Sequence, residues 1–172
     1  MHKGHNIISY FILLIIFAGC QKEFDIAASD LKRLGTSARD LLSAEKYTAL
    51  KVEVAYMPGY EPDAHSLQLL AAFLNTYLNK PDGIQVIKTP IKRSGKSTLS
   101  ITDLVLLEKQ NRSVFTQSNT ITVYINLADA PFDEEGVLAT SYWNTSIALF
   151  GPALYESAGG AGHESCPKLL TV

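Results

Sequence analysis

The chain has 172 residues, of which 47% are hydrophobic and 19% charged, and its formal net charge is −2. This length and apolar content are typical of one globular domain with a buried core, and they argue against a disordered chain. Fifteen Lys and Arg against seventeen Asp and Glu leave no basic field, and positive clusters such as Lys92-Arg93 are short. The composition therefore excludes nucleic acid as an expected partner.

The first 19 residues have the pattern of a bacterial lipoprotein signal peptide. An apolar run over residues 7–17 follows a short polar segment with one Lys, and the small pair Ala18-Gly19 stands directly before Cys20. A membrane-spanning helix needs about 20 apolar residues, and this run is about half as long. We therefore expect cleavage before Cys20, lipidation of Cys20, and attachment to a membrane through the lipid. Ordinary secretion, with Cys20 discarded or left as a thiol, is the alternative.

The segment after Cys20 bears on localisation. Residues 21–25, Gln-Lys-Glu-Phe-Asp, resemble the short acidic sequence that directs lipoproteins of Bacteroidetes to the outer face of the outer membrane. The expected location is therefore the outer membrane, and this segment leaves two readings open: a signal for exposure at the cell surface, or a solvated tether. With Cys20 acylated, Cys166 has no partner for an intrachain disulfide or a thiolate zinc site.

The mature chain is expected to consist of a tether with a short helix over residues 20–49 and one α/β domain over residues 50–172. Thr36 or Ser37 can cap the short helix, and Asp40 falls in its first turn.

A strand and a helix open the domain. Residues 50–56 alternate apolar and polar side chains, which predicts a strand that ends at the following Pro-Gly turn. Asp63 can cap a helix over residues 64–79, and a second strand is expected over residues 83–89. The apolar face of this helix consists of Leu67, Leu70, Ala71, Leu74 and Leu78.

A second helix is expected to begin at Thr98 or Ser100, with Asp103 in its first turn. Its inward residues are Leu104, Leu107 and, as an option, Val105. The charged residues Glu108, Lys109 and Arg112 are expected in water.

Residues 120–150 are expected to form the centre and one edge of the sheet. They hold runs of β-branched and aromatic residues, broken by a turn-forming segment over residues 129–136. Too little chain joins the strands expected at 137–142 and 145–150 for a crossover, so they should form an antiparallel hairpin at one side. The alternation of strands and helices predicts an α/β (α+β) fold: a mixed, twisted sheet of about five strands with two backing helices.

The chain offers no complete active site. Gly95-Lys-Ser97 lacks the earlier Gly of a phosphate-binding loop, because Pro90 stands there. The acidic turn of Asp133, Glu134 and Glu135 is most simply solvated, with calcium binding as a weaker alternative. His163-Glu164 resembles the start of a zinc-peptidase HExxH motif, but position 167 is Pro, which would break the helix.

Several segments of the sequence nevertheless resemble segments of one protein family. They are residues 35–43, residues 80–85, residues 141–150 and the pair Gly159-Gly160, which together span most of the mature chain. In these segments the chain is similar to membrane-anchored zinc metalloproteases of Bacteroidetes, relatives of the metzincins. The resemblance implies an incomplete metzincin-like upper subdomain that ends before the helix with HExxHxxG.

The resemblance also implies a role for one strand. In such domains an antiparallel edge strand pairs with an extended substrate, and here that strand would be Val137, Leu138, Ala139, Thr140, Ser141 and Tyr142. Zinc would be expected in full-length relatives, whereas no catalytic residue, metal ligand or cofactor is assigned in this chain.

Two functions remain open from the sequence. The chain is either a lipoprotein of a zinc metalloprotease-like family that lacks the zinc-binding helix and is inactive alone, or a complete non-catalytic surface lipoprotein. In the second case it would bind peptides or protein partners through the edge of its sheet. A structural lipoprotein with a coincidental pattern is the third reading.

Overall fold

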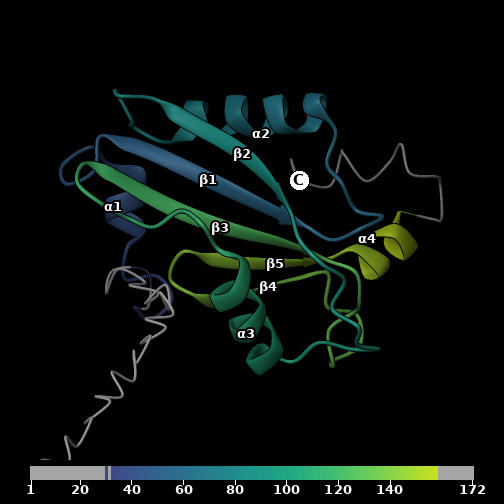
Figure 1. Ribbon diagram of the computed structural model, residues 1–172. Coiled ribbons are helices and arrows are strands. Elements are labelled where there is room, and N and C mark those ends of the chain that lie inside the picture. Colours follow the sequence, from purple (N-terminus) through teal and green to yellow (C-terminus); the bar gives the residue numbers. More distant parts are fainter. Residues whose placement is uncertain (1–29, 31, 159–172) are drawn as a thin grey trace, which may run out of the picture.

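The computed structural model describes residue 30 and residues 32–158 (Figure 1). The elements follow in the order α1 (Ala38–Leu42), β1 (Ala49–Tyr56), α2 (Ala64–Tyr77), β2 (Ile84–Pro90), α3 (Ile101–Asn111), β3 (Thr120–Ala128), β4 (Ala139–Trp143), β5 (Ser146–Phe150) and α4 (Gly151–Ser157).

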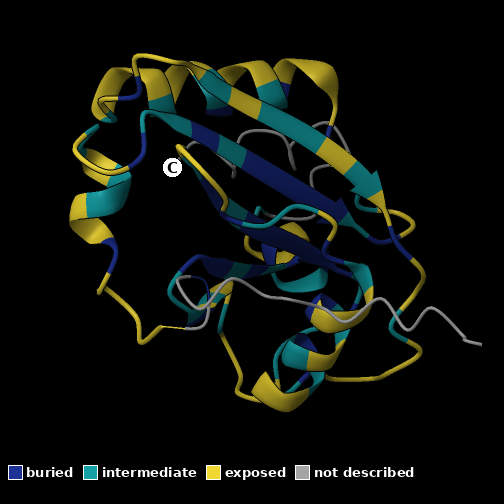
Figure 2. Ribbon diagram, turned by 60° about the vertical axis from the view of Figure 1, so that its left-hand side comes forward, coloured by how far each residue is buried: buried dark blue, intermediate teal, exposed yellow. Residues whose placement is uncertain are grey.

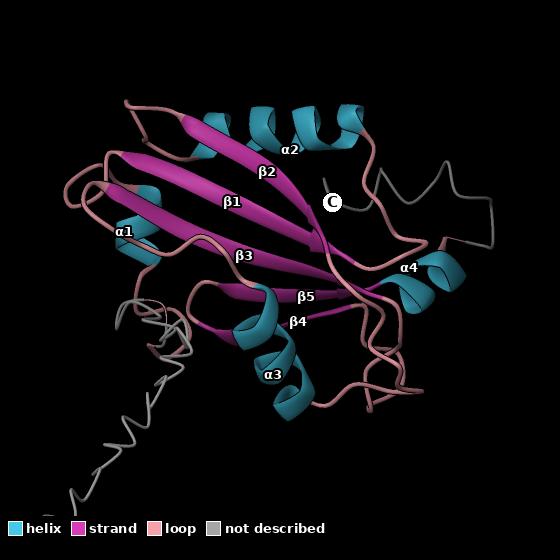
Figure 3. Cartoon of the chain, viewed as in Figure 1, coloured by secondary structure: helices cyan, strands magenta, loops and turns pink. Residues whose placement is uncertain are grey.

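All five strands join one mixed sheet in the order β2-β1-β3-β5-β4. The pairs β1–β2, β1–β3 and β3–β5 are parallel, and β4 runs antiparallel to β5. This confirms the predicted mixed α/β fold. The expectation that β3 is central, with an antiparallel hairpin at one side, is also confirmed (Figure 3).

The two long helices cover opposite faces of the sheet (Figure 1). After β1 the chain moves outward to β2 through α2, and it then returns across β1 to β3 through α3. Since parallel crossovers are right-handed, a reversal of direction in the sheet places the second helix on the other face. The α3 face extends over β5 and β4, where the edge of the sheet lies.

The face under α2 is apolar, as the sequence predicts. Alternate residues of β1 and β3 point to it, and Leu70 of α2 is buried against them. The Asp63 side chain caps α2, accepting a hydrogen bond from the Ser66 backbone N–H (2.8 Å). Leu67, Leu74 and Leu78 are half-buried on the same cluster, so the predicted face is right. Figure 2 shows the buried strands and the exposed outer side of α2.

The face under α3 has a mixed character. Leu99 and Leu104 are buried there among Tyr124, Ala148 and Phe150. Ser100 and Asp103 cap α3 reciprocally, each side chain bonding the other residue's backbone N–H, which confirms the later of the two predicted starts.

The prediction that Glu108 and Arg112 lie in water is wrong; only Lys109 of the three is exposed. Glu108 is 0% and Arg112 2% exposed, because the strands below them carry polar residues instead of apolar ones. Arg112 Nη1 donates to Glu108 Oε1 (2.7 Å), and Ser146 Oγ donates to the same oxygen (2.8 Å). Further polar partners of the Arg112 guanidinium are Thr122 Oγ1 (2.7 Å), the Val114 carbonyl (2.8 Å) and Asp30 Oδ2 (3.3 Å).

Glu53 of β1 is a second buried carboxylate on this face, although the alternation in β1 would place it outside. It accepts hydrogen bonds from the backbone N–H groups of Ser113 and Val114 (2.9 and 3.0 Å), and from the Ser113 hydroxyl (2.6 Å). These bonds replace the water that burial removes. The loop after α3 is therefore fixed to the sheet by polar contacts.

Candidate functional site

Strand β4 is one of the two edges of the sheet in the described part of the chain, and β2 is the other. The Phe150 N–H donates to the Leu138 carbonyl (2.9 Å), so these two residues form a hydrogen-bonded pair just before the strand. Such pairs alternate along an antiparallel ladder, and Thr140 takes part in the next one. The backbone N–H and C=O groups of Ala139 and Ser141 therefore point away from β5, and both residues are exposed.

The position of β4 is fixed by its aromatic residues. Tyr142 is buried on the α3 face, and its ring lies 5.9 Å from that of Trp143. Burial, followed by the negative charge of Glu108, raises the pKa of Tyr142 far above its usual range. A bulge between Ser141 and Trp143 ends the regular register. The part of the edge that can accept another strand therefore ends at Ser141.

The sequence-predicted substrate strand is placed slightly differently by the structure. It is expected over residues 137–142, whereas β4 begins at Ala139 and ends at Trp143. Val137 and Leu138 precede the strand and line a cavity instead. The turn of the hairpin is accordingly Asn144-Thr145, one residue later than predicted.

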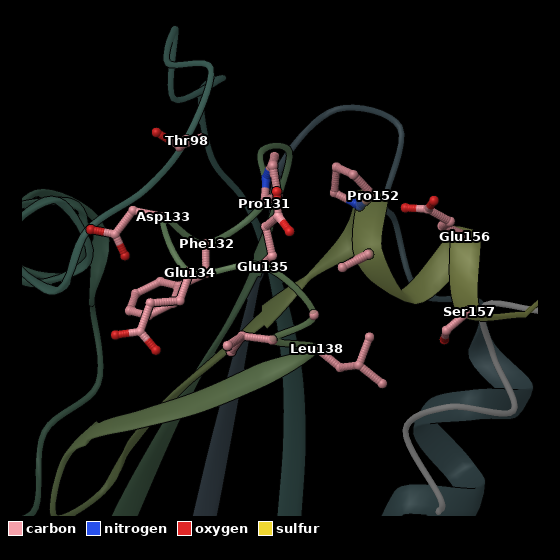
Figure 4. A pocket seen from close by; sticks show the side chains of 13 residues that line it. Thr98, Pro131, Phe132, Asp133, Glu134, Glu135, Leu138, Pro152, Glu156 and Ser157 are labelled. Atoms are coloured by element: carbon pink, nitrogen blue, oxygen red, sulfur yellow. The ribbon is translucent and has the colours of Figure 1, made fainter.

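This cavity, of about 890 Å³, opens at the start of β4 between the loop over residues 131–138 and helix α4 (Figure 4). The loop is tied to the body of the domain: Leu99 N–H donates to the Pro131 carbonyl (2.9 Å), and the Phe132 ring packs 5.2 Å from that of Phe150. The residues that line the cavity are Thr98, Pro131, Phe132, Asp133, Glu134, Glu135, Gly136, Val137, Leu138, Pro152, Ala153, Glu156 and Ser157.

The lining combines apolar walls with an acidic rim. Four of the lining residues carry carboxylates: Asp133, Glu134, Glu135 and Glu156. All four are exposed, which agrees with the solvated acidic turn expected from the sequence. No ion pair joins any of them to a cation among the residues that the structure describes.

Helix α4 is the part of this site that sequence reasoning missed. No helix is expected after Phe150 from the sequence, but residues 151–157 are helical. Pro152 was the available signal, because Pro favours the first turn of a helix. Glu156 and Ser157 reach the cavity only because this turn forms.

The histidines and cysteines do not form a site in the described residues. His65 lies exposed in the first turn of α2, where Asp63 and not His65 provides the cap. Cys20, His163, Glu164 and Cys166 lie outside the described residues. Within residues 30 and 32–158 no group of three or more His, Cys, Asp or Glu is placed to hold a metal ion.

None of the helices in the described ranges is long and apolar enough to cross a membrane.

Comparison with protein-family models, with curated proteins and with solved structures found no match to this chain.

Proposed function

We propose that this chain binds an extended peptide, or an extended segment of a protein partner, as an additional strand along β4. The observation that carries the proposal is the pair of outward-facing backbone positions, Ala139 and Ser141, on an edge strand fixed by buried Tyr142. Main-chain hydrogen bonds to such an edge supply affinity for extended segments of many sequences.

A comparison of the two edges of the sheet supports β4 as the binding edge. The edge strand β2 carries Lys88 and ends at Pro90, residues that oppose the addition of another strand. β4 has the sequence Ala-Thr-Ser-Tyr-Trp, with no charge and no Pro. Its backbone is held in place before any ligand arrives, so binding loses little conformational entropy.

The resemblance to metzincin-like zinc proteases concerns the same edge strand. We propose that the chain is a lipoprotein anchored to the outer membrane through Cys20, related to metzincin-like zinc proteases, and inactive without a zinc-binding helix. An antiparallel edge strand on an otherwise parallel sheet supports it, since the resemblance implies such a strand. The non-catalytic peptide-binding lipoprotein is the alternative, and both share the β4 edge.

The coding sequence downstream separates these two readings, whereas metal content and cleavage test both of them. Purified chain should contain no stoichiometric zinc and should show no chelator-sensitive cleavage of a mixed peptide library. DNA sequence that encodes HExxHxxG directly downstream of codon 172 would favour the protease lineage. Stoichiometric zinc with chelator-sensitive cleavage by this chain alone would contradict both readings.

Hydrogen exchange measured by NMR tests the binding edge. The probe is the peptide acetyl-Val-Thr-norleucine-Thr-Val-amide, which is uncharged and rich in strand-forming residues. Saturating peptide should protect the amide hydrogens of Ala139 and Ser141, while that of Thr140 is protected already by β5. N-methylation of the peptide residues whose amides face β4 should abolish this protection, because those amides can no longer donate hydrogen bonds. N-methylation of the other, alternate residues should leave the protection in place. Unchanged exchange at Ala139 and Ser141 would contradict the proposal.

A further inference from the structure

The cavity adjoins the binding edge directly. Val137 and Leu138 line the cavity and stand immediately before Ala139 in the chain. Outward-facing backbone positions recur every second residue, so the series of Ser141 and Ala139 continues to Val137. A bound segment that pairs with Ser141 and Ala139 therefore has the residue two positions further along at the mouth of the cavity, opposite Val137. The edge and the cavity define the site, and the cavity lining decides which side chain is preferred there.

The walls of the cavity suit a long aliphatic stem. Phe132, Leu138, Pro152 and Ala153 provide apolar surface between the loop and α4 (Figure 4). Lys and Arg bury such a stem along apolar surface while the charged end remains in water. A short polar side chain would leave this surface uncovered.

The rim of the cavity favours a positive charge. Its four carboxylates, Asp133, Glu134, Glu135 and Glu156, are exposed. No Lys or Arg is among the lining residues, and two cations of the loop before Thr98 pair with other carboxylates: Lys96 Nζ lies 2.9 Å from Asp103, and Arg93 Nη1 lies 3.7 Å from Asp129.

A bound metal ion is a poorer fit to the same carboxylates. They are spread around the opening, and no cluster suitable for a metal ion occurs in the described part of the chain. We therefore infer that the segment bound along β4 carries a Lys or Arg side chain in this cavity, an inference that rests on the proposed edge binding.

Three peptides that differ at one position test this inference. The host is acetyl-Val-Thr-Val-Thr-Xaa-Thr-Val-amide, with Lys, norleucine or Glu at Xaa, so that its first, third and fifth residues can lie opposite Ser141, Ala139 and Val137. Affinity is measured from the chemical shifts of the Ala139 and Ser141 amides. The Lys peptide should bind about 3- to 10-fold more tightly than the norleucine peptide at low salt, since exposed ion pairs are individually weak. The Glu peptide should bind most weakly, and added salt should reduce the differences.

Two charge-matched variants locate the effect. Glu135→Gln combined with Glu156→Gln should remove most of the preference for Lys. Glu45→Gln combined with Asp82→Asn removes the same charge at the opposite end of β1 and should leave the preference intact. Unchanged exchange protection of β1 amides verifies that each variant is folded.

The outcomes separate this inference from the proposed function. Equal affinity of the three peptides would overturn the inference and leave edge binding in place. A Lys preference that persists in the Glu135→Gln/Glu156→Gln variant would also overturn it. If none of the three peptides changes the Ala139 and Ser141 amides, edge binding itself fails and the inference fails with it.

Discussion

Arg112→Met should be one of the most destabilising single substitutions on the α3 face. Arg112 is buried between two carboxylates, with Nη1 at 2.7 Å from Glu108 and Nη2 at 3.3 Å from Asp30. Met fills much of the volume but leaves both carboxylates buried without their cation. Removing one partner of a buried ion pair costs about 3–5 kcal/mol, because an uncompensated charge remains. Domains have stabilities of about 5–15 kcal/mol, so the loss is a large fraction of the total.

Urea unfolding, followed by the fluorescence of the single Trp, measures this cost. Trp143 lies half-buried on β4, next to the network, so it reports on the relevant region. Lys109→Met removes an exposed cation from the same helix and should change the unfolding free energy by less than about 0.5 kcal/mol. Adding Glu108→Leu to Arg112→Met should recover part of the loss, since the unpaired charge is removed with its partner. A cost below about 1 kcal/mol for Arg112→Met would refute this account of the buried charges.

Three further predictions follow from other parts of the chain. Leu70→Ala should lower the unfolding free energy by about 2–5 kcal/mol through lost burial and a cavity, while Leu69→Ala, on the exposed side of α2, should cost little. A similar loss for both would show that the buried face is wrongly assigned. The hydrogen bond from Lys96, followed by bonds at the helix cap, lowers the pKa of Asp103 to about 2. The stability that this carboxylate contributes should be present above about pH 4 and lost as the pH falls toward 2, so thermal midpoints of wild type and Asp103→Ala should converge over that range. In bacteria that express the chain, incorporation of a labelled fatty acid should disappear with Cys20→Ala, and label that survives would contradict lipidation at Cys20.

The succession of strands and helices along the chain could be predicted because it follows from local patterns. β-branched runs, Pro-Gly and Asn turns, and the Asp63 and Ser100 caps are all encoded within a few residues. The reversal from α2 to α3 then places the helices on opposite faces by handedness alone. The hairpin could be predicted from the short connection between its two strands alone, which in the structure runs between Trp143 and Ser146.

The buried charges could not be predicted from helical periodicity. That method assigns Glu108 and Arg112 to water because charged residues are usually exposed. Whether a charge is buried depends on partners distant in the sequence, here Asp30 and Thr122. The polar residues of the strands were a usable signal, since Ser146 stands where an apolar residue would otherwise pack. The candidate cavity was missed for a related reason, because the loop and α4 that form it are separated by the whole hairpin.

Peptide binding at β4 should offset a loss of stability on the α3 face, because the peptide binds only the folded state. Glu108 accepts a hydrogen bond from Ser146 of β5, and its charge acts on buried Tyr142 of β4. A peptide that binds only the folded state stabilises it by about 2.7 kcal/mol at 100 times the dissociation constant. This gain is comparable with the cost expected for Arg112→Met. Saturating Lys peptide should therefore restore most of the variant's lost stability in urea unfolding. If the variant stays folded in dilute buffer but the peptide adds nothing to its stability, β4 does not hold its binding position without the buried network, and the edge depends on the α3 face for its shape.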